Sequence, residues 1–162
     1  MQIIRAIWHP VETQIDSYLN VAPETPQYDE VVYVWEQDAQ TELESRGYKT
    51  RLIVSDKFND NGNQFGRKLL AIDAGLKEFG EVLFLDWDCN FVRPMDNRFF
   101  ELLAEKETQI PIYAHNIDNP WSSSFKLEED VYLSSNFGFI YSRDKDLGEQ
   151  LVNLAVANDV TA

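Results

Sequence analysis

The sequence predicts an α/β fold, in which a mostly parallel central sheet carries helices on both faces. The main observation is the order of its segments, because short apolar strands alternate with amphipathic helices over the first half of the chain. That alternation is typical of βαβ units, whose consecutive strands run parallel. The second observation is a length of 162 residues with 44% hydrophobic side chains, which is enough for one core. We therefore expect a single domain covering residues 1–162.

The predicted strands are rich in β-branched and aromatic residues and end at turn-forming residues. In the first half of the chain they cover residues 2–8, 30–35, 48–54 and 82–85, the last being a run of four apolar residues after Gly80. In the second half we expect a short strand at 110–114 and one or two strands within 131–141. The segment between them, 115–130, is expected to be irregular.

The predicted helices follow from apolar residues spaced three or four apart. The clearest is 64–79, with Phe65, Leu69, Ile72, Leu76 and Phe79 on one side. Glycine after a periodic segment is typical of a helix C-terminus, so Gly80 should end this helix and Gly47 a polar helix over 36–46. Further helices are expected at 11–19, after Pro10, at 97–106, and from Asp144 onward.

The charge balance limits the classes of partner. The formal net charge is −14, from 28 acidic and 14 basic residues, which argues against nucleic acid bound through a basic face. No apolar run approaches the roughly 20 residues of a membrane span, and the start lacks the apolar region of a signal peptide. The single cysteine, Cys89, excludes an internal disulfide. We expect a cytoplasmic protein.

Two carboxylates follow the fourth predicted strand, Val82–Leu85, in the motif Leu85-Asp86-Trp87-Asp88. Residues two apart on an extended chain point to the same side, so Asp86 and Asp88 can converge just past the carboxyl end of the strand. Open α/β sheets bind ligands at that edge. Hard oxygen ligands suit Mg²⁺ or Mn²⁺, and the motif therefore predicts a divalent cation site.

The chain resembles the GT-A superfamily of nucleotide-sugar glycosyltransferases, in particular small bacterial or viral members with an Asp-x-Asp motif. The pieces that carry the resemblance are the first strand ending Ile7-Trp8-His9, the basic stretch Arg67-Lys68-Leu69-Leu70, the Leu85-Asp86-Trp87-Asp88 motif and Asn136-Phe137-Gly138-Phe139-Ile140. The resemblance covers most of residues 1–142. It implies a Rossmann-like GT-A fold with a minimal acceptor region.

The resemblance also implies a reaction and a set of residues. The donor would be a UDP-sugar such as UDP-glucose, bound with Mn²⁺ or Mg²⁺, and the acceptor an unknown saccharide, lipid or protein. Asp86 and Asp88 would hold the metal and the donor, with Trp87 between them, and Lys68 would contact the diphosphate, with Arg67 as second choice. The remaining donor-binding residues would be Ile7, Trp8 and His9 at the base, and Asn136 and Gly138 at the sugar.

Several roles stay open. The family often adds a third metal ligand from a C-terminal segment, for which His115 or Asp159 could serve. If the reaction inverts the anomeric configuration, a general base is needed, and Glu128, Glu129 and Asp130 offer carboxylates, with Asp130 preferred. A retaining reaction needs no dedicated base. Trp121 is the candidate for stacking on an acceptor sugar.

Two other classes of protein are compatible with the motif. A haloacid-dehalogenase-like phosphatase also carries Asp-x-Asp after a buried strand, but Asn90-Phe91 stands here where Gly-Thr is usual, and the motif comes late in the chain. The other class is a non-catalytic domain that binds a nucleotide sugar. Hydrolysis of an aryl phosphate would favour the first, and metal-dependent UDP binding without turnover would favour the second.

Overall fold

The computed structural model describes residues 1–8, 28–58, 64–89, 91, 94–110, 112–116, 125–128, 131–135 and 138–157. For residues 64–65, 112–116, 125–128 and 131–135 only the course of the backbone is described.

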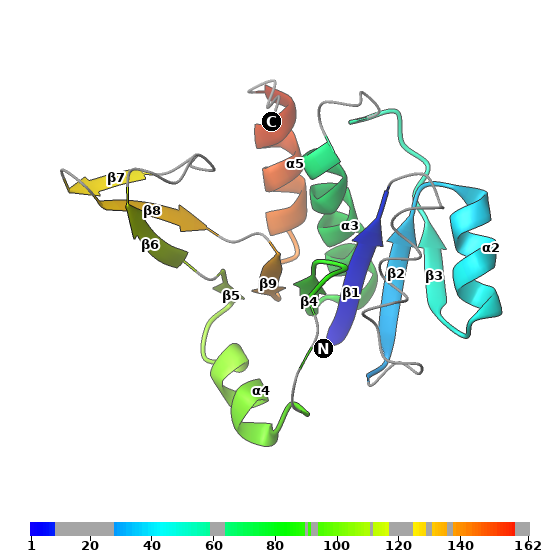
Figure 1. Ribbon diagram of the computed structural model, residues 1–162, viewed down its shortest axis with the longest axis horizontal. Coiled ribbons are helices and arrows are strands. Elements are labelled where there is room, and N and C mark those ends of the chain that lie inside the picture. Colours follow the sequence, from blue (N-terminus) through cyan, green and yellow to red (C-terminus); the bar gives the residue numbers. More distant parts are fainter. Residues whose placement is uncertain are drawn as a thin grey trace.

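A six-stranded mixed sheet forms the centre of the molecule, in the order β3-β2-β1-β4-β9-β5 (Figure 1). Parallel pairing joins β1 (Gln2–Ile7), β2 (Glu30–Val34), β3 (Lys49–Leu52) and β4 (Val82–Leu85). Antiparallel pairing adds β9 (Phe139–Ser142) to β4 and β5 (Thr108–Gln109) to β9. The mostly parallel sheet is thus confirmed for the first four strands. Only β9 runs in the opposite direction, because it pairs antiparallel with both β4 and β5, and β5 therefore runs in the direction of β4.

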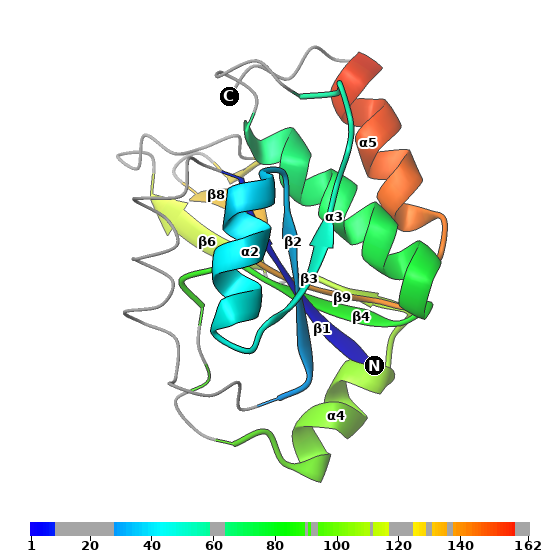
Figure 2. The same cartoon turned by 90° about the vertical axis from the view of Figure 1, so that its right-hand side faces the viewer.

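Helices cover both faces of this sheet, as expected. On one face, α3 (Gln64–Phe79) contributes Ile72 and Leu76 to a core with Ile4 and Phe84, and α5 (Leu147–Ala157) packs beside α3. On the other face, α2 (Gln37–Ser45) and α4 (Asn97–Ala104) each cover a separate apolar cluster. Figure 2 shows α3 and α5 on one side of the strands and α2 on the other. The sheet is therefore buried on both sides, which explains its continuous apolar strands.

The ends of two helices were predicted from glycines, and both are confirmed. Gly47 has φ +90° and donates its N–H to Glu44 O at 3.0 Å after α2. Gly80 has φ +75° and donates its N–H to Leu76 O at 2.9 Å after α3. An L side chain rarely adopts such a φ, whereas glycine does so without a steric penalty.

A second, three-stranded antiparallel sheet extends from the main body on the left of Figure 1. Its order is β6 (Ile112–Asn116), β8 (Val131–Ser135) and β7 (Phe125–Glu128). The prediction that residues 115–130 are irregular was therefore wrong at 115–116 and 125–128, which lie in strands. Lys126 and Glu128 have a low propensity for strands, so the local sequence did not predict β7. Its pairing with β8 forms the strand nevertheless.

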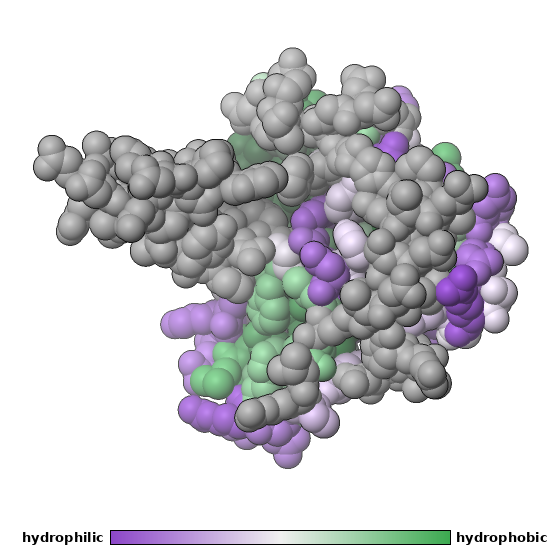
Figure 3. Space-filling model, viewed as in Figure 1, coloured by the Kyte–Doolittle hydropathy of each residue, from purple (hydrophilic) through white to green (hydrophobic). Residues whose placement is uncertain are grey.

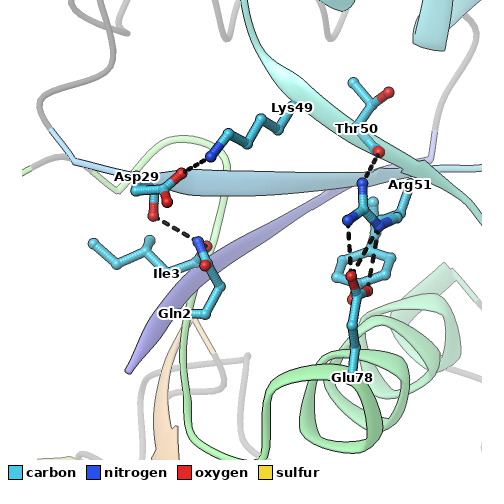
Figure 4. A network of polar contacts seen from close by, with 8 residues as sticks. Gln2, Ile3, Asp29, Lys49, Thr50, Arg51 and Glu78 are labelled. Atoms are coloured by element: carbon cyan, nitrogen blue, oxygen red, sulfur yellow. Dashed lines mark hydrogen bonds and ion pairs between the residues drawn. The ribbon is translucent and has the colours of Figure 1, made fainter.

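Polar contacts join the segment before β2 to β1 and β3, and join β3 to α3, as Figure 4 shows. Asp29, before β2, accepts bonds from Lys49 Nζ at 2.6 Å and, through its carbonyl, from Gln2 Nε2 at 2.6 Å. Arg51 on β3 forms an ion pair with Glu78 on α3 at 2.8 Å. The Lys49 and Asp29 side chains are 63% and 66% exposed, so water competes for this pair.

The described surface includes an apolar area over α4 (Figure 3), where Phe100 and Leu102 are exposed. Among the described residues, no helix is both long and apolar enough to cross a membrane.

Candidate functional site

The order of the strands reverses at one point along the carboxyl edge of the sheet, between β1 and β4. From β1 the chain continues to β2 on one side, while β4, reached later, pairs on the other side of β1. The carboxyl ends of β1 and β4 therefore flank the position where the strand order reverses. Open α/β sheets bind ligands in the crevice at such a position. Trp8 follows β1 here, and Asp86 follows β4.

The Asp-x-Asp motif lies in a tight turn. Strand β4 ends at Leu85, and Cys89 N–H donates to Asp86 O at 3.0 Å. The extended course assumed for residues 86–88 therefore stops after β4. The Asp86 N–H donates to Gly138 O at 2.8 Å, so the start of the turn is also fastened to the segment that leads into β9. Gly138, expected beside the donor sugar, is thus brought next to Asp86.

Lys68 on α3 holds the Asp86 carboxylate. Its Nζ lies 2.6 Å from Oδ1 and donates a hydrogen bond to Oδ2 at 2.7 Å. The Lys68 and Asp86 side chains are 9% and 21% exposed, so this pair is largely shielded from water. Burial raises the pKa of Asp86, and the charge of Asp88 adds to that rise, whereas Lys68 and Arg5 oppose it. The site thus joins two carboxylates and a fixed cation.

Asp88 differs from Asp86 in its surroundings, because it is exposed. Trp87 between them is partly buried and packs against the cluster beneath α2, which includes Ile7 and Val32. The indole therefore anchors the turn on one face of the sheet while Lys68 anchors it on the other. An exposed carboxylate on a turn anchored in this way is available to a ligand.

Arg5, in the middle of β1, is the residue that our sequence reasoning missed. It is 4% exposed, and its Nε donates to Glu30 Oε2 on β2 at 3.0 Å. Its Nη1 donates to Asp86 O at 2.9 Å and to Cys89 O at 2.6 Å. The signal was available: a charged residue inside the apolar run Ile3-Ile4-Arg5-Ala6-Ile7 has to be paired when the strand is buried.

Arg67, the second choice for a diphosphate contact, binds backbone instead. Its Nη1 donates to Trp8 O at 2.7 Å and its Nε to Phe58 O at 3.3 Å. Its guanidinium carbon lies 5.7 Å from the centre of the Trp35 ring. These contacts join the ends of β1 and β2 to α3. Lys68 Nζ also lies 5.7 Å from the Trp8 ring, so both basic residues face tryptophans at the sheet edge.

The remaining candidates divide into two groups. The Ile7 side chain is fully buried beneath α2, so only its backbone can face a ligand, and Trp8 is 8% exposed. His115 lies in β6 by its backbone. Glu128 is the last residue of β7. The other candidates lie outside the described residues: His9, Trp121, Glu129, Asp130, Asn136 and Asp159.

The carboxylates fit a cation that arrives with its substrate. Among the described residues, no cluster of three or more His, Cys, Asp or Glu side chains could hold a metal alone. Lys68 forms an ion pair with Asp86 and donates a hydrogen bond to Oδ2, whereas the buried Oδ1 accepts no hydrogen bond from the described part of the chain. The exposed Asp88 is the more accessible ligand. Mg²⁺ is commonly held by one or two carboxylates together with substrate phosphates. Asp88, with Asp86 behind it, is a donor set of this kind.

The architecture is similar to the solved structure of CMP:2-keto-3-deoxy-manno-octonic acid synthetase complexed with CTP. The two chains share 11% sequence identity with a TM-score of 0.50, and the match covers 98% of this chain and 86% of that chain. At this identity the likeness shows a shared fold. No protein-family model matches the chain, and no curated protein matches it by sequence.

Proposed function

We propose that this protein is a metal-dependent glycosyltransferase, which transfers a sugar from a UDP-sugar donor to an acceptor. The observation that supports the proposal most is the position of the Asp86–Cys89 turn. It lies at the carboxyl ends of β1 and β4, where the strand order reverses, and it carries an exposed carboxylate beside a buried ion pair. A nucleotide diphosphate bound at that edge would lie nearer to the exposed Asp88 carboxylate than to the more buried Asp86.

Each residue has a role in this proposal. Asp88 would be a ligand of Mn²⁺ or Mg²⁺, with Asp86 as the second carboxylate, and the cation would offset the charge that develops on the departing diphosphate. Lys68 holds Asp86 in place and contributes a fixed positive charge to a strongly anionic protein. Trp8 lies at the strand end where the base would bind. Asp130 is the proposed general base if configuration is inverted.

The test is a panel of UDP-sugars incubated with Mn²⁺, in which UDP release is measured with and without EDTA. We expect slow hydrolysis of one donor, which EDTA and Asp88→Ala abolish. Lys49→Met, on the exposed pair far from the turn, is the matched control and should hydrolyse the donor at the wild-type rate. Absence of turnover and of UDP binding with any metal would contradict the proposal, whereas UDP binding without turnover would favour a non-catalytic domain.

The likeness in fold to a synthetase bound to CTP favours nucleotidyl transfer as a second candidate. Such an enzyme releases pyrophosphate from a nucleoside triphosphate, and the same carboxylates would then hold the cation of the triphosphate. Incubation with CTP and a panel of acidic sugars distinguishes the two reactions. Pyrophosphate release with no UDP release would favour this candidate, and the reverse would favour glycosyl transfer.

A further inference from the structure

Arg5 is a buried cation whose contacts converge on the Asp-x-Asp turn. It lies on the face of β1 between the apolar clusters that α2 and α4 cover, and it is 4% exposed. A guanidinium carries five N–H donors in a fixed plane, so it can serve several acceptors in defined directions. Here it serves Glu30 Oε2 at 3.0 Å and the backbone carbonyls of Asp86 at 2.9 Å and Cys89 at 2.6 Å.

Those two carbonyls are the first and last of the turn. Cys89 N–H donates to Asp86 O at 3.0 Å and closes the turn. Arg5 donates to the carbonyls of the same two residues from the face of the sheet that α2 and α4 cover. Lys68 holds the Asp86 carboxylate from the opposite face. Only Trp87 and Asp88 lie between the two anchored residues, so their backbone has little freedom left.

We infer that Arg5 is a positioning residue: with Glu30 as its counter-ion, it fixes the turn that presents the Asp88 carboxylate at the sheet edge. An aliphatic side chain would fill this place in β1 at a lower desolvation cost, so the particular contribution of Arg5 is its set of donors. The consequence for donor binding rests on the proposed function, whereas the fixed turn does not.

The chain contains its own reporter, because Cys89 is its only cysteine and ends the turn. Its thiol is partly buried, so the rate of modification by a thiol reagent measures how often the turn opens. Opening of the turn would expose the thiol further, so a variant in which the turn is less well fixed should be modified faster.

The experiment compares modification rates of wild type, Arg5→Lys, the double variant Arg5→Met/Glu30→Met, and Arg51→Met, each at several low urea concentrations. Arg51 is an ion-paired arginine on β3 with a 48% exposed side chain, and serves as the matched control. We expect the double variant to react at least about tenfold faster than wild type, since hydrogen bonds to a charged group are lost. The rate should not depend on urea, because local opening exposes little surface. Arg5→Lys should be intermediate, and Arg51→Met should match wild type.

A wild-type rate for the double variant overturns the inference, and so does an acceleration that rises with urea as global unfolding does. Should the double variant not fold, Arg5→Lys decides, and a wild-type rate for it overturns the inference. A second arm measures Mn²⁺-dependent UDP binding, which should weaken in the Arg5 variants and not in Arg51→Met. Faster modification in a protein whose wild type binds no nucleotide would contradict the proposed function and leave the positioning role intact.

Discussion

Two lysine–aspartate ion pairs beside the parallel strands differ in their exposure to water. At the carboxyl end, Lys68 and Asp86 form a pair that is 9% and 21% exposed. Near the amino ends, Lys49 and Asp29 form a pair of the same length that is 63% and 66% exposed. Charged residues that serve only solubility are expected to be exposed, as Lys49 and Asp29 are. Shielded charges cost desolvation energy, so their retention at the carboxyl end points to a site.

The largest expected effect is on UDP-sugar hydrolysis. It distinguishes Asp88, the exposed carboxylate of the turn, from exposed charged residues elsewhere. Asp88→Ala should reduce UDP-sugar hydrolysis at least about hundredfold, because a metal ligand is lost, while unfolding by urea changes by less than about 0.5 kcal/mol. Lys49→Met should leave hydrolysis unchanged. Hydrolysis retained in Asp88→Ala would show that Asp88 is an ordinary surface residue.

Matched lysine substitutions test the two pairs directly. Lys68→Met should lower the free energy of unfolding by about 3 kcal/mol, because it leaves the largely buried Asp86 carboxylate without its ammonium partner. Lys49→Met should lower it by only about 0.5 kcal/mol, since its partner remains hydrated. Urea denaturation of both variants measures the difference. Equal losses would mean that the burial of the first pair has no energetic consequence.

The protonation of Asp86 should respond to its neighbours. Its raised pKa means that the folded state binds this proton more tightly than the unfolded chain, so its contribution to stability is present below pH 3.8 and is lost as pH rises through the folded pKa. Carboxyl ¹³C NMR should show that Asp88→Asn lowers the pKa of Asp86 and that Lys68→Met raises it further. No shift in either variant would rule out the electrostatic coupling within the turn.

The smallest effect concerns salt. At about 1 M NaCl the screening length falls to roughly 3 Å, so the stability difference between wild type and Lys49→Met should disappear. The difference between wild type and Lys68→Met should persist, because ions do not reach a buried pair. Denaturation at two salt concentrations measures both differences, and parallel losses for the two variants would contradict the contrast between the pairs.

Local patterns in the sequence were sufficient for much of the fold. The spacing of Leu69, Ile72 and Leu76 predicted α3 with the bounds that the structure gives it, and Gly47 and Gly80 marked two helix ends. These features depend on neighbours in the sequence. The strand β7 could not be predicted in this way, because its pairing with β8 decides it.

The sequence predicted that Asp86 lies at the carboxyl end of a buried strand, but it did not predict the contacts around this residue. A buried strand leading to Asp86 located the sheet edge, and the resemblance to a known family implied Lys68, near the head of the helix before that strand. The turn at 86–89 and the role of Arg5 depend on contacts across about 80 residues of sequence, as in Arg5 with Asp86, separated by 81. No local periodicity encodes such a contact.

In the proposed function, the Asp86–Cys89 turn binds a nucleotide diphosphate together with a divalent cation. The most direct measurement is a calorimetric titration of wild type and Asp88→Ala with UDP, each with Mn²⁺ and with EDTA. We expect wild type to bind UDP with Mn²⁺ and not with EDTA, and we expect no binding by Asp88→Ala. Binding that persists in Asp88→Ala, or no binding by wild type with Mn²⁺, would contradict the proposed function.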